Sequence, residues 1–566
     1  MRWGRQSKIA SPLSWRLLEG HSSQDYQLTI DKLLVQTVHR RSQSEIVYGK
    51  TRYNWVEFYS RIRKLAAGLE GMGVRRGSKV AVIDFDTNRY LEAYFAIPMM
   101  GAILHTVNIR LPPEHIGYTM GHAGDDFVLL RDDFIPLATK LAGAVTSIKG
   151  VVTMSDSGSA PSLPLPNVKF YDDMLAEADG SYTFPDLDEN TQATIFYTSG
   201  TTGMPKGVWF THRQIVLHTL GSMLGLNASA PQNRLDPTDV VLPLVPFFHV
   251  HCWGIPYGVA MNGQKLVLAG RYDYGNVLDL VAREKVTFSD MVPTILNMLV
   301  NHPSAEKYRE ALSHWKVVIG GAALPRELAV RARKLGIKVM GGYGLSETAP
   351  ILTLANPNER LRMLSDEELL DNLYLKTGIP IPLVQIRVVD GEMRDVPRDG
   401  KAAGEIVVRG PWLTREYYKD EAKTQELWAG GWLHTGDMAV IDEEGYLMIV
   451  DRIKDAVKSG GEWIPTLILE DLIMRHPAVL EAAVIGARQA QWGERPVAVV
   501  SLREGQRATE EELSRHLQKF VDEGKIAKFW IPERFIVWSE ALPKTSTGKL
   551  DKKPLREKYS DVLTSG

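Results

Sequence analysis

The stretch from Tyr197 to Gly207, with the sequence Tyr-Thr-Ser-Gly-Thr-Thr-Gly-Met-Pro-Lys-Gly, constrains the fold most. It follows the apolar run 193–196, which is typical of a buried strand. Glycines let such a loop fold tightly enough for its backbone N–H groups to converge on phosphate oxygens, while the hydroxyls add donors and Lys206 adds charge. Because Pro205 occupies the place of the second glycine, the stretch is not a Walker P-loop. Composition alone leaves a plain Ser/Gly connector as an equal alternative.

Length and charge narrow the class of protein. The 566 residues predict more than one domain and a large core. The net charge of −2 argues against a nucleic-acid partner, and the single cysteine, Cys252, excludes an intramolecular disulfide framework. Residues 1–27 do not resemble a signal peptide, and the chain lacks an apolar run long enough to span a membrane. We therefore expect a soluble, cytoplasmic protein without a transmembrane segment.

Local patterns predict the fold class. Asn54 and Glu57 are typical of a helix start, and apolar residues on one helical face follow them. Helix-then-strand units recur through residues 90–350, which predicts α/β layers with largely parallel sheets. From 386 to 408 the pattern changes to short strands separated by turns.

The last hundred or so residues are predicted to form a separate small domain. Thr509 and Glu512 form a capping box ahead of an apolar stripe. We place the domain boundary at the charged segment 451–455, although composition alone favours a solvated turn there.

Four further stretches carry candidate chemistry. In the run 341–348, clustered glycines would allow a flat ligand to approach the backbone, Tyr343 could stack on a base, and Glu347 could bind a metal. Taken alone, however, a run of this composition more often forms a simple turn. The others are 432–437, ending in an aspartate that could cap its own turn, then 451–463, and finally 543–549 near the C-terminus.

These motifs, in this order, resemble those of the acyl-adenylate-forming superfamily, which includes acyl-CoA synthetases, luciferases and peptide-synthetase adenylation domains. The resemblance covers about 28–559 and is greatest to bacterial and archaeal medium- and long-chain fatty acyl-CoA synthetases. It implies a large N-terminal domain (1–450) of layered α/β sheets with a β-barrel-like part. A hinge (451–455) and a small, mobile α+β domain (456–566) would follow.

The resemblance also implies roles for individual residues. Lys549 would reach into the active site during adenylation, and Lys454 would lie at the pivot. Glu347 and Thr198 would bind Mg²⁺, Tyr343 would pack on adenine, and Asp437 would accept the ribose hydroxyls. The remaining residues expected to bind ATP or AMP are Ser199, Gly200, Thr201, Thr202, Gly203, Gly342, Gly344, Thr348 and Arg452, with Lys206 as a further catalytic cation.

The run 247–253 contains two histidines and a cysteine, which suggests zinc. A strand would place His249 and His251 on one face and Cys252 on the other, so we do not expect a metal there. The resemblance instead makes this run a strand of the acyl pocket. The expected pocket residues are His249, Trp253 as a gate, Gly320, Gly321 and Ala322, and those on the CoA side are Lys458, Gly460, Gly461 and Trp463. Pro465 and Thr466 depart from the small hydroxylated residues usual after this last motif.

The resemblance implies an AMP-forming acyl-CoA ligase that uses ATP, Mg²⁺ and CoA to activate a medium- or long-chain fatty acid. Alternatives are a ligase for an aryl or short hydroxy acid, or a stand-alone adenylation enzyme that loads a carrier protein. A homodimer and peripheral contact with a membrane stay open, although no basic amphipathic helix is evident.

Overall fold

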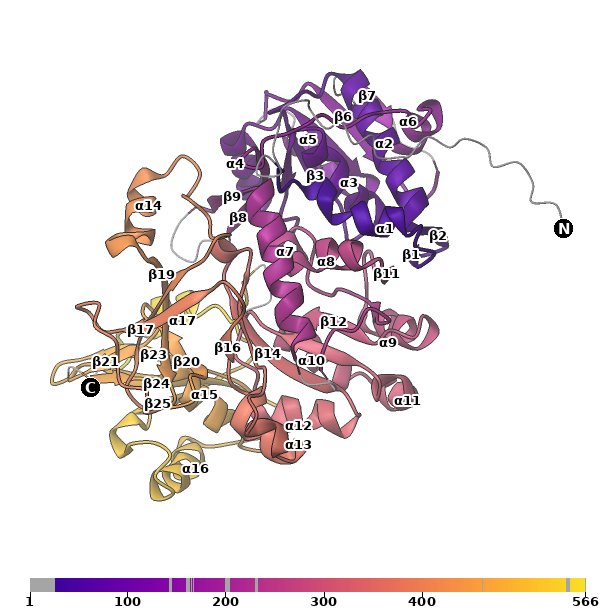
Figure 1. The fold of residues 1–566 in the computed structure, drawn as a ribbon. Helices are drawn as coiled ribbons and strands as arrows, with labels where there is room; N and C mark the ends of the chain where they lie inside the picture. The colour runs from indigo at the N-terminus through magenta and orange to yellow at the C-terminus, as the bar shows by residue number, and fades with distance from the viewer. Residues whose placement is uncertain are drawn as a thin grey trace.

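A computed structural model describes residues 26–141, 145–158, 163, 165, 167–198, 204–229, 233–460, 462–545 and 550–564, without the side chains of Leu141, Asp366 and Glu462 (Figure 1). Several residues with expected roles lie outside the described residues: Ser199, Gly200, Thr201, Thr202, Gly203, Gly461 and Lys549.

The N-terminal part of the chain builds a seven-stranded sheet in the order β7-β6-β5-β3-β4-β8-β9. All neighbours are parallel except β8 and β9, which form an antiparallel pair. The strands are β3 (Lys79–Ile83), β4 (Ile103–Thr106), β5 (Phe127–Arg131), β6 (Gly150–Met154), β7 (Val168–Phe170), β8 (Gln192–Thr198) and β9 (Lys206–Thr211). Helices α2 (Trp55–Met72), α3 (Asn88–Met99), α4 (Pro113–Ala123), α5 (Ile135–Leu141) and α6 (Tyr171–Glu177) connect or cover them.

A nine-stranded sheet follows, in the order β16-β15-β14-β13-β12-β10-β11-β1-β2. Its strands from β14 to β1 are parallel to their neighbours, and both edges are antiparallel. The bounds are β1 (Glu45–Tyr48), β2 (Thr51–Asn54), β10 (Val240–Val241), β11 (Lys265–Leu268), β12 (Phe288–Met291), β13 (Lys316–Ile319), β14 (Lys338–Gly344), β15 (Ile351–Leu354) and β16 (Ile379–Pro380). Helices α7 (His212–Asn227), α8 (Ile255–Asn262), α9 (Tyr274–Arg283), α10 (Pro293–Val300) and α12 (Arg326–Lys334) belong to this region, and α7 contacts both β9 and β15 (Figure 1). The expectation of largely parallel α/β layers is confirmed.

The expected helix after Asn54 is α2, and its start and buried face are confirmed. The Asn54 side chain accepts hydrogen bonds from the N–H groups of Val56 and Glu57, both at 3.0 Å. This cap satisfies two of the donors that the first helical turn leaves unpaired. The apolar residues predicted to share one face are all fully buried: Phe58, Ile62, Leu65 and Leu69.

The short strands near residue 400 form a four-stranded antiparallel sheet: β17 (Gln385–Val389), β18 (Gly404–Arg409), β19 (Leu433–Ile441) and β20 (Leu447–Arg452). The C-terminal residues form a five-stranded sheet: β21 (Val457–Ser459), β22 (Glu462–Ile464), β23 (Val479–Gln489), β24 (Gly493–Leu502) and β25 (Arg534–Trp538). It carries α15 (Thr466–Met474), α16 (Glu510–Asp522) and α17 (Lys553–Tyr559). The capping box at Thr509 and Glu512 starts α16 as predicted.

The hydrophobic core is divided along the chain. The largest buried cluster runs from Ile30 to Leu447, and a separate cluster within the C-terminal sheet begins at Val457. A small apolar cluster around Met438, Val440 and Val450 lies between them. Segment 451–455 thus connects two regions that each have their own core.

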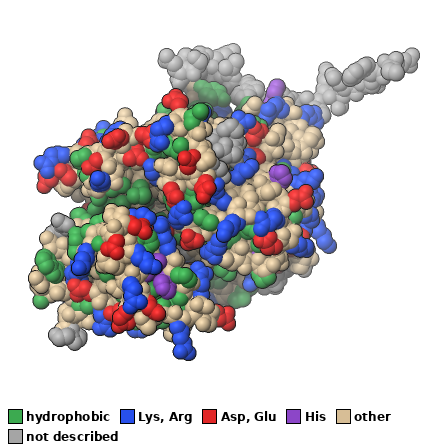
Figure 2. Space-filling view, turned by 90° about the horizontal axis from the view of Figure 1, so that it is seen from below, with side chains coloured by type: hydrophobic (Ala, Val, Ile, Leu, Met, Phe, Trp, Pro, Cys, Tyr) green, Lys and Arg blue, Asp and Glu red, His purple; other side chains and the backbone are tan. Residues whose placement is uncertain are grey.

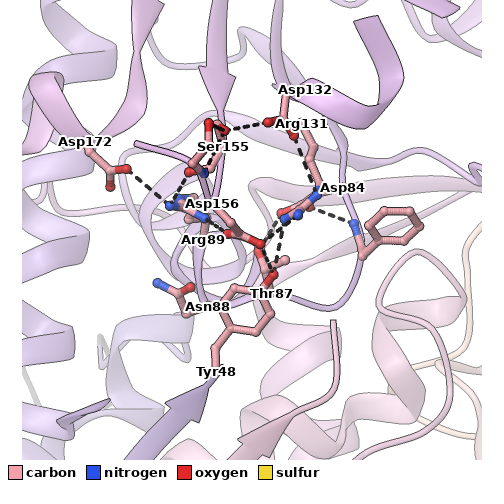
Figure 3. A network of polar contacts seen from close by, with 12 residues as sticks. Tyr48, Asp84, Thr87, Asn88, Arg89, Arg131, Asp132, Ser155, Asp156 and Asp172 are labelled. Atoms are coloured by element: carbon pink, nitrogen blue, oxygen red, sulfur yellow. Dashed lines mark hydrogen bonds and ion pairs between the residues drawn. The ribbon is translucent and has the colours of Figure 1, made fainter. Parts of the chain in front are cut away.

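A network of polar side chains ties the two large sheets together (Figure 3). Arg131 at the end of β5 donates to the Asp156 carboxylate at 2.7 Å, and Arg89 on α3 donates to it at 2.9 Å. Tyr48, at the end of β1 in the other sheet, donates to the same carboxylate at 2.7 Å. The carboxyl ends of the parallel strands of one sheet are therefore joined to β1, the strand next to one edge of the second sheet.

In the part of the chain that the structure describes, no helix is long and apolar enough to cross a membrane. Figure 2 shows acidic and basic side chains interspersed over one face of the molecule, in line with a net charge of only −2.

Candidate active site

A cavity of about 590 Å³ lies where the large region meets the small C-terminal one. Its walls come from β8, β9, β13, β14, β19 and β20, and from the segment before α17. The sequence-predicted residues that line it are Thr198, Lys206, Gly342, Tyr343, Gly344, Glu347, Asp437, Arg452, Lys454, His249, Trp253, Gly320 and Gly321. Segments far apart in the sequence therefore converge on one space.

The two ends of the glycine-rich loop are held side by side at the cavity. Thr198, the last residue of β8, is paired with Lys206, the first residue of β9. The ammonium group of Lys206 lies 4.5 Å from the ring centroid of Tyr417, a cation–π distance. Tyr418 donates its backbone N–H to the carbonyl oxygen of Gly207 at 2.8 Å. The segment containing Tyr417 and Tyr418 thus supports the end of the loop.

The run 341–348 is not a simple turn, because its first half is the end of strand β14. A Cβ atom on Gly344 would lie 1.9 Å from the carbonyl oxygen of Pro350, so only glycine fits at this position. Glu347 follows in a short 3₁₀ turn and accepts a hydrogen bond from the hydroxyl of Tyr417 at 2.7 Å. Thr348 is fully buried and outside the cavity, with its hydroxyl used by Leu345.

Asp437 lies at the centre of a polar triangle. It is in β19 directly after Gly436, whose φ is +69°, and it is paired in register with Arg452 on β20. The Tyr343 hydroxyl donates to one carboxylate oxygen at 2.8 Å, and the Arg452 guanidinium lies 3.2 Å from the other. Asp437 is only 4% exposed. The alternative that this aspartate merely caps its own turn is therefore wrong.

Lys454 follows this triangle and also lines the cavity. Burial lowers the pKa of its ammonium group from the ordinary value, and the nearby Arg452 charge lowers it further. Both effects disfavour the charged form, as expected for a cation partly removed from water.

The strand expected at 247–253 is wrong. Residues 250–254 form one helical turn, and Val250, His251, Cys252 and Trp253 all have positive φ values, from +40° to +56°. Left-handed backbone costs roughly 1–2 kcal/mol per residue, and here the turn is held by complete burial of its side chains. The alternation of side chains along the sequence cannot reveal such a turn, because the turn depends on packing against both large sheets.

The same turn separates the two histidines. His249 and Trp253 line the cavity, whereas His251 is packed among aromatic rings, and burial lowers its pKa to about 3. The Cys252 thiol donates to the backbone carbonyl of Val245 at 2.9 Å. Among the described residues there is no cluster of three or more His, Cys, Asp or Glu side chains suited to a metal ion.

Trp253 lines the cavity beside Gly320. A Cβ atom on Gly320 would lie 3.0 Å from the Trp253 ring, so the glycine lets the indole approach β13. Gly321 also lines the cavity, but Ala322 is exposed and does not.

The described residues expected on the CoA side, Lys458, Gly460 and Trp463, do not line this cavity. The Lys458 ammonium lies 5.3 Å from the ring centroid of Trp463, which is 40% exposed. A Cβ on Gly460 would lie 2.8 Å from the ring of Trp492, which is 47% exposed. The contact of Trp492 with Gly460 was not predicted from the sequence.

Residues on both sides of the undescribed part of the C-terminal motif line the cavity. Thr545 and Leu550, which flank the part that is not described, line the cavity together with Lys552. The Lys552 ammonium pairs with the Glu470 carboxylate at 2.6 Å and donates to the Thr466 hydroxyl, also at 2.6 Å.

A second contact anchors the hinge segment to the same place. The backbone N–H of Thr466 donates to the buried Asp451 carboxylate at 2.6 Å. Lys552 and Tyr417 thus fix the positions of other residues around the cavity. Neither role can be recognised in the sequence, because each side chain contacts residues more than sixty positions away.

The donor set of the cavity fits Mg²⁺. Thr198 and Glu347 both line it and offer a hydroxyl and a carboxylate, the hard oxygen ligands that Mg²⁺ prefers. Few protein ligands suffice for this ion where water and substrate phosphates complete the shell.

Comparison with known proteins agrees with the motifs. Residues 34–418 match the family model described as AMP-binding enzyme, and 469–549 match that of the AMP-binding enzyme C-terminal domain. A long-chain-fatty-acid–CoA ligase of Thermus thermophilus is 42% identical over 90% of this chain and 91% of its own length. A medium-chain-fatty-acid–CoA ligase of Ectopseudomonas oleovorans is 36% identical over 95% and 97%.

Among solved structures, ATP-bound MatB from Rhodopseudomonas palustris is similar, with a TM-score of 0.80 at 25% identity over 94% of this chain and 100% of MatB. The expected architecture, a large layered α/β domain followed by a smaller C-terminal one, is confirmed by this likeness and by the sheets described above. The chain belongs to the family of AMP-binding enzymes, the acyl-adenylate-forming enzymes that its motifs resemble.

Proposed function

We propose that this protein is an AMP-forming acyl-CoA ligase, an acid–thiol ligase that activates a medium- or long-chain fatty acid. The observation that carries the proposal is the convergence of Thr198, Lys206, Glu347, Asp437 and Arg452 on one cavity that Trp253 also lines. The cavity therefore has both polar, charged groups and apolar side chains in its walls. A nucleotide and an apolar acyl chain need both kinds of wall.

In the first half-reaction, a carboxylate oxygen of the acid attacks the α-phosphorus of ATP. The new O–P bond forms as the bond to pyrophosphate breaks, which gives the acyl-adenylate. Tyr343 would pack on adenine, while Asp437 would accept the ribose hydroxyls and Arg452 would contact the ribose and phosphates. Bound Mg²⁺ would neutralise charge on the phosphate oxygens, with Glu347 and Thr198 as its protein ligands.

Positive charge near the α-phosphate of the transferred adenylyl group is the chief contribution expected of the protein. Lys206 at the end of the loop and Lys549 in the C-terminal motif are the proposed sources. The loop residues Ser199 to Gly203 would add backbone N–H groups around the phosphates.

In the second half-reaction, the CoA thiolate attacks the acyl carbonyl carbon, and AMP leaves with the bonding electrons. We propose that residues 456–566 rotate as a domain on the hinge 451–455, with Lys454 at the pivot, between the two steps. This motion would withdraw Lys549 and bring Lys458, Gly460, Gly461 and Trp463 to the acyl-adenylate. The position of Lys458, Gly460 and Trp463 away from the cavity supports a rearrangement before thioester formation.

The test is ATP–pyrophosphate exchange with acetate, octanoate, palmitate, benzoate and a cinnamate, together with CoA-dependent release of AMP. Exchange that peaks with octanoate or palmitate, followed by CoA-driven turnover, is expected. Exchange only with an aromatic acid would overturn the substrate class, and turnover with a carrier protein but not with CoA would overturn the acceptor. Removal of Mg²⁺ with a chelator should abolish exchange.

We also propose that the protein is cytoplasmic and that it contacts the membrane surface when its acid is a lipid. By analogy with the family, we propose that it forms a homodimer. Cell fractionation and light scattering of the purified protein test these two points.

A further inference from the structure

Asp290 is a carboxyl group that the proposed chemistry does not use. It lies on β12 and is 0% exposed, and neither of its carboxyl oxygens has a hydrogen-bond partner among the described residues. A buried polar group without a partner is costly, so native proteins rarely keep one without a reason. The position of Asp290 indicates what the reason is.

The side chain of Asp290 is on the face of the sheet that borders the acyl end of the cavity. Asp290 is paired with Val318 of the parallel strand β13, and paired residues of neighbouring strands present their side chains on the same face. Val318 lines the cavity. Gly320, two residues after Val318 and just past the end of β13, lies against the Trp253 ring. Asp290 therefore lies one strand away from the cavity wall, beside the turn that carries the proposed gate.

The surroundings favour the neutral form of this carboxyl group. Burial raises the pKa of Asp290 well above its ordinary value. The backbone N–H groups of Asp290 itself and of Leu244 are near enough to oppose this in part, but neither has the geometry of a hydrogen bond to the carboxyl group. The nearby carboxyl group of Asp86 raises the pKa further. A neutral carboxyl group offers one O–H donor and retains acceptor capacity, so it can pair with a hydroxyl or an ether-like atom.

Cys252, in the turn 250–254 that carries Trp253, is a second group affected by Asp290. The pKa of its thiol is raised, first by burial and then by the charges of Asp290 and Asp86. The thiol donates to the Val245 carbonyl rather than to Asp290, so it does not satisfy the carboxyl group. The carboxyl group thus stays available to a ligand that enters past Trp253.

We propose that Asp290 is a specificity-determining residue of the acyl site, and that its carboxyl group forms a hydrogen bond with a polar atom on the acyl chain. The substrate class that this selects is an aliphatic acid with a hydroxyl, ether or thioether atom partway along its chain. The inference rests on the proposed function, because it requires the chain of the activated acid to pass Trp253. An unsubstituted chain leaves Asp290 unpaired, whereas a correctly placed polar atom satisfies it, so discrimination of about 10- to 100-fold is expected.

The experiment measures kcat/KM for ATP–pyrophosphate exchange with octanoate and with hydroxyoctanoates that carry the hydroxyl group at successive positions. A second matched pair is 3-(methylthio)propanoate and pentanoate, which differ by sulfur in place of one methylene. The wild-type protein should prefer at least one substituted acid over its parent by about tenfold or more. Asp290→Leu should lose this preference while keeping activity on the parent acid, and Asp290→Asn should retain most of it.

Asp84 provides a matched control. It is as buried as Asp290 and follows β3 in the other sheet, but its carboxyl group accepts hydrogen bonds from the Thr87 hydroxyl at 2.5 Å and from the Phe85 N–H at 2.7 Å (Figure 3). Asp84→Leu should lower the thermal unfolding midpoint and leave the ratio of kcat/KM values unchanged. Asp290→Leu should raise the midpoint, because it removes a buried polar group that has no partner.

Two results would overturn the inference: a wild-type protein with no preference for any substituted acid, or an Asp290→Leu variant that keeps the preference. Unfolding of Asp290→Leu would contradict the expected stabilisation and assign Asp290 a structural role. Absence of exchange with every acid, in the presence of Mg²⁺, would instead overturn the proposed function, and the inference would fall with it.

Discussion

The hydroxyl of Tyr417 donates a hydrogen bond to the Glu347 carboxylate at 2.7 Å, while its ring lies 4.5 Å from the Lys206 ammonium. One side chain therefore orients the proposed Mg²⁺ ligand and the proposed cation of the phosphate loop. Its contacts hold both groups toward the cavity that they line. This makes Tyr417 a positioning residue that touches neither reacting atom.

Tyr417→Phe should raise the Mg²⁺ concentration needed for half-maximal exchange by about 10- to 100-fold, the effect expected when one hydrogen bond to a charged group is lost. Because the phenyl ring keeps the contact with Lys206, Tyr417→Leu should lose more. Binding of Mn²⁺ in the presence of ATP, followed by electron paramagnetic resonance, provides a readout apart from activity. Tyr418→Phe is the matched control, and equal effects of the two Phe variants would contradict the role.

Lys549→Ala should slow adenylation by about 10²–10³-fold, the scale for one group that stabilises transition-state charge. Thioester formation from a supplied acyl-adenylate and CoA should continue at close to the wild-type rate. Stopped-flow measurement of each half-reaction distinguishes the two steps. Equal losses in both would be incompatible with a domain rotation that removes Lys549 before the second step.

Asp437→Asn should weaken ATP binding by about 10- to 100-fold, because a buried charged acceptor next to Tyr343 and Arg452 is replaced by a neutral amide. Isothermal titration calorimetry with ATP measures this without requiring turnover. Asp442→Asn, which removes a carboxylate paired with Lys376 at 2.7 Å outside the cavity, should leave ATP affinity unchanged. Unaltered affinity in Asp437→Asn would exclude its proposed contact with the ribose.

Lys552→Met should destabilise the C-terminal region by about 3–5 kcal/mol, because it leaves the buried Glu470 carboxylate without its cation. Burial raises the pKa of Glu470 and Lys552 opposes this rise, so the unpaired carboxyl should take up a proton. The double variant Lys552→Met with Glu470→Leu should recover much of the loss. Urea denaturation followed by tryptophan fluorescence measures these differences, and additive losses would contradict the pairing.

Asp156 predicts a dependence of stability on acid pH. Burial acts to raise the pKa of its carboxyl group, but hydrogen bonds from Arg131, Tyr48 and Arg89 outweigh it and lower the pKa from 3.8 to about 2. Because the folded-state pKa is the lower one, the stabilisation is complete above about pH 4 and is lost as the pH falls through 2. Asp156→Asn should cost about 1 kcal/mol at pH 7, a modest value because the carboxylate is partly exposed.

The difference in unfolding free energy between wild type and Asp156→Asn should shrink as the pH falls from 4 toward 2. Urea denaturation at a series of pH values measures it. A difference that stays constant over this range would show that the carboxylate charge contributes nothing.

Much of the fold could be predicted from local patterns. The cap at Asn54, the buried face of α2 and the capping box at Thr509 depend on residues within a turn or two of one another, and the structure confirms them. The alternation of helices and strands likewise predicts parallel sheets, because a crossover helix returns the chain in the same direction. The order of the motifs was sufficient to indicate the family.

The tertiary structure alone decided which residues support those motifs. The left-handed turn at 250–253 is maintained by packing between two sheets, so alternation along the chain wrongly predicted a strand. Tyr417 meets Glu347 across 70 positions, and Lys552 meets Thr466 across 86. Asp290 is not distinguished from other strand residues in the sequence, but its register with Val318 places it, without a hydrogen-bond partner, beside the wall of the cavity. The physical reason is that a local pattern records which face of an element is apolar, whereas the partner of a buried polar group is set by how distant elements pack.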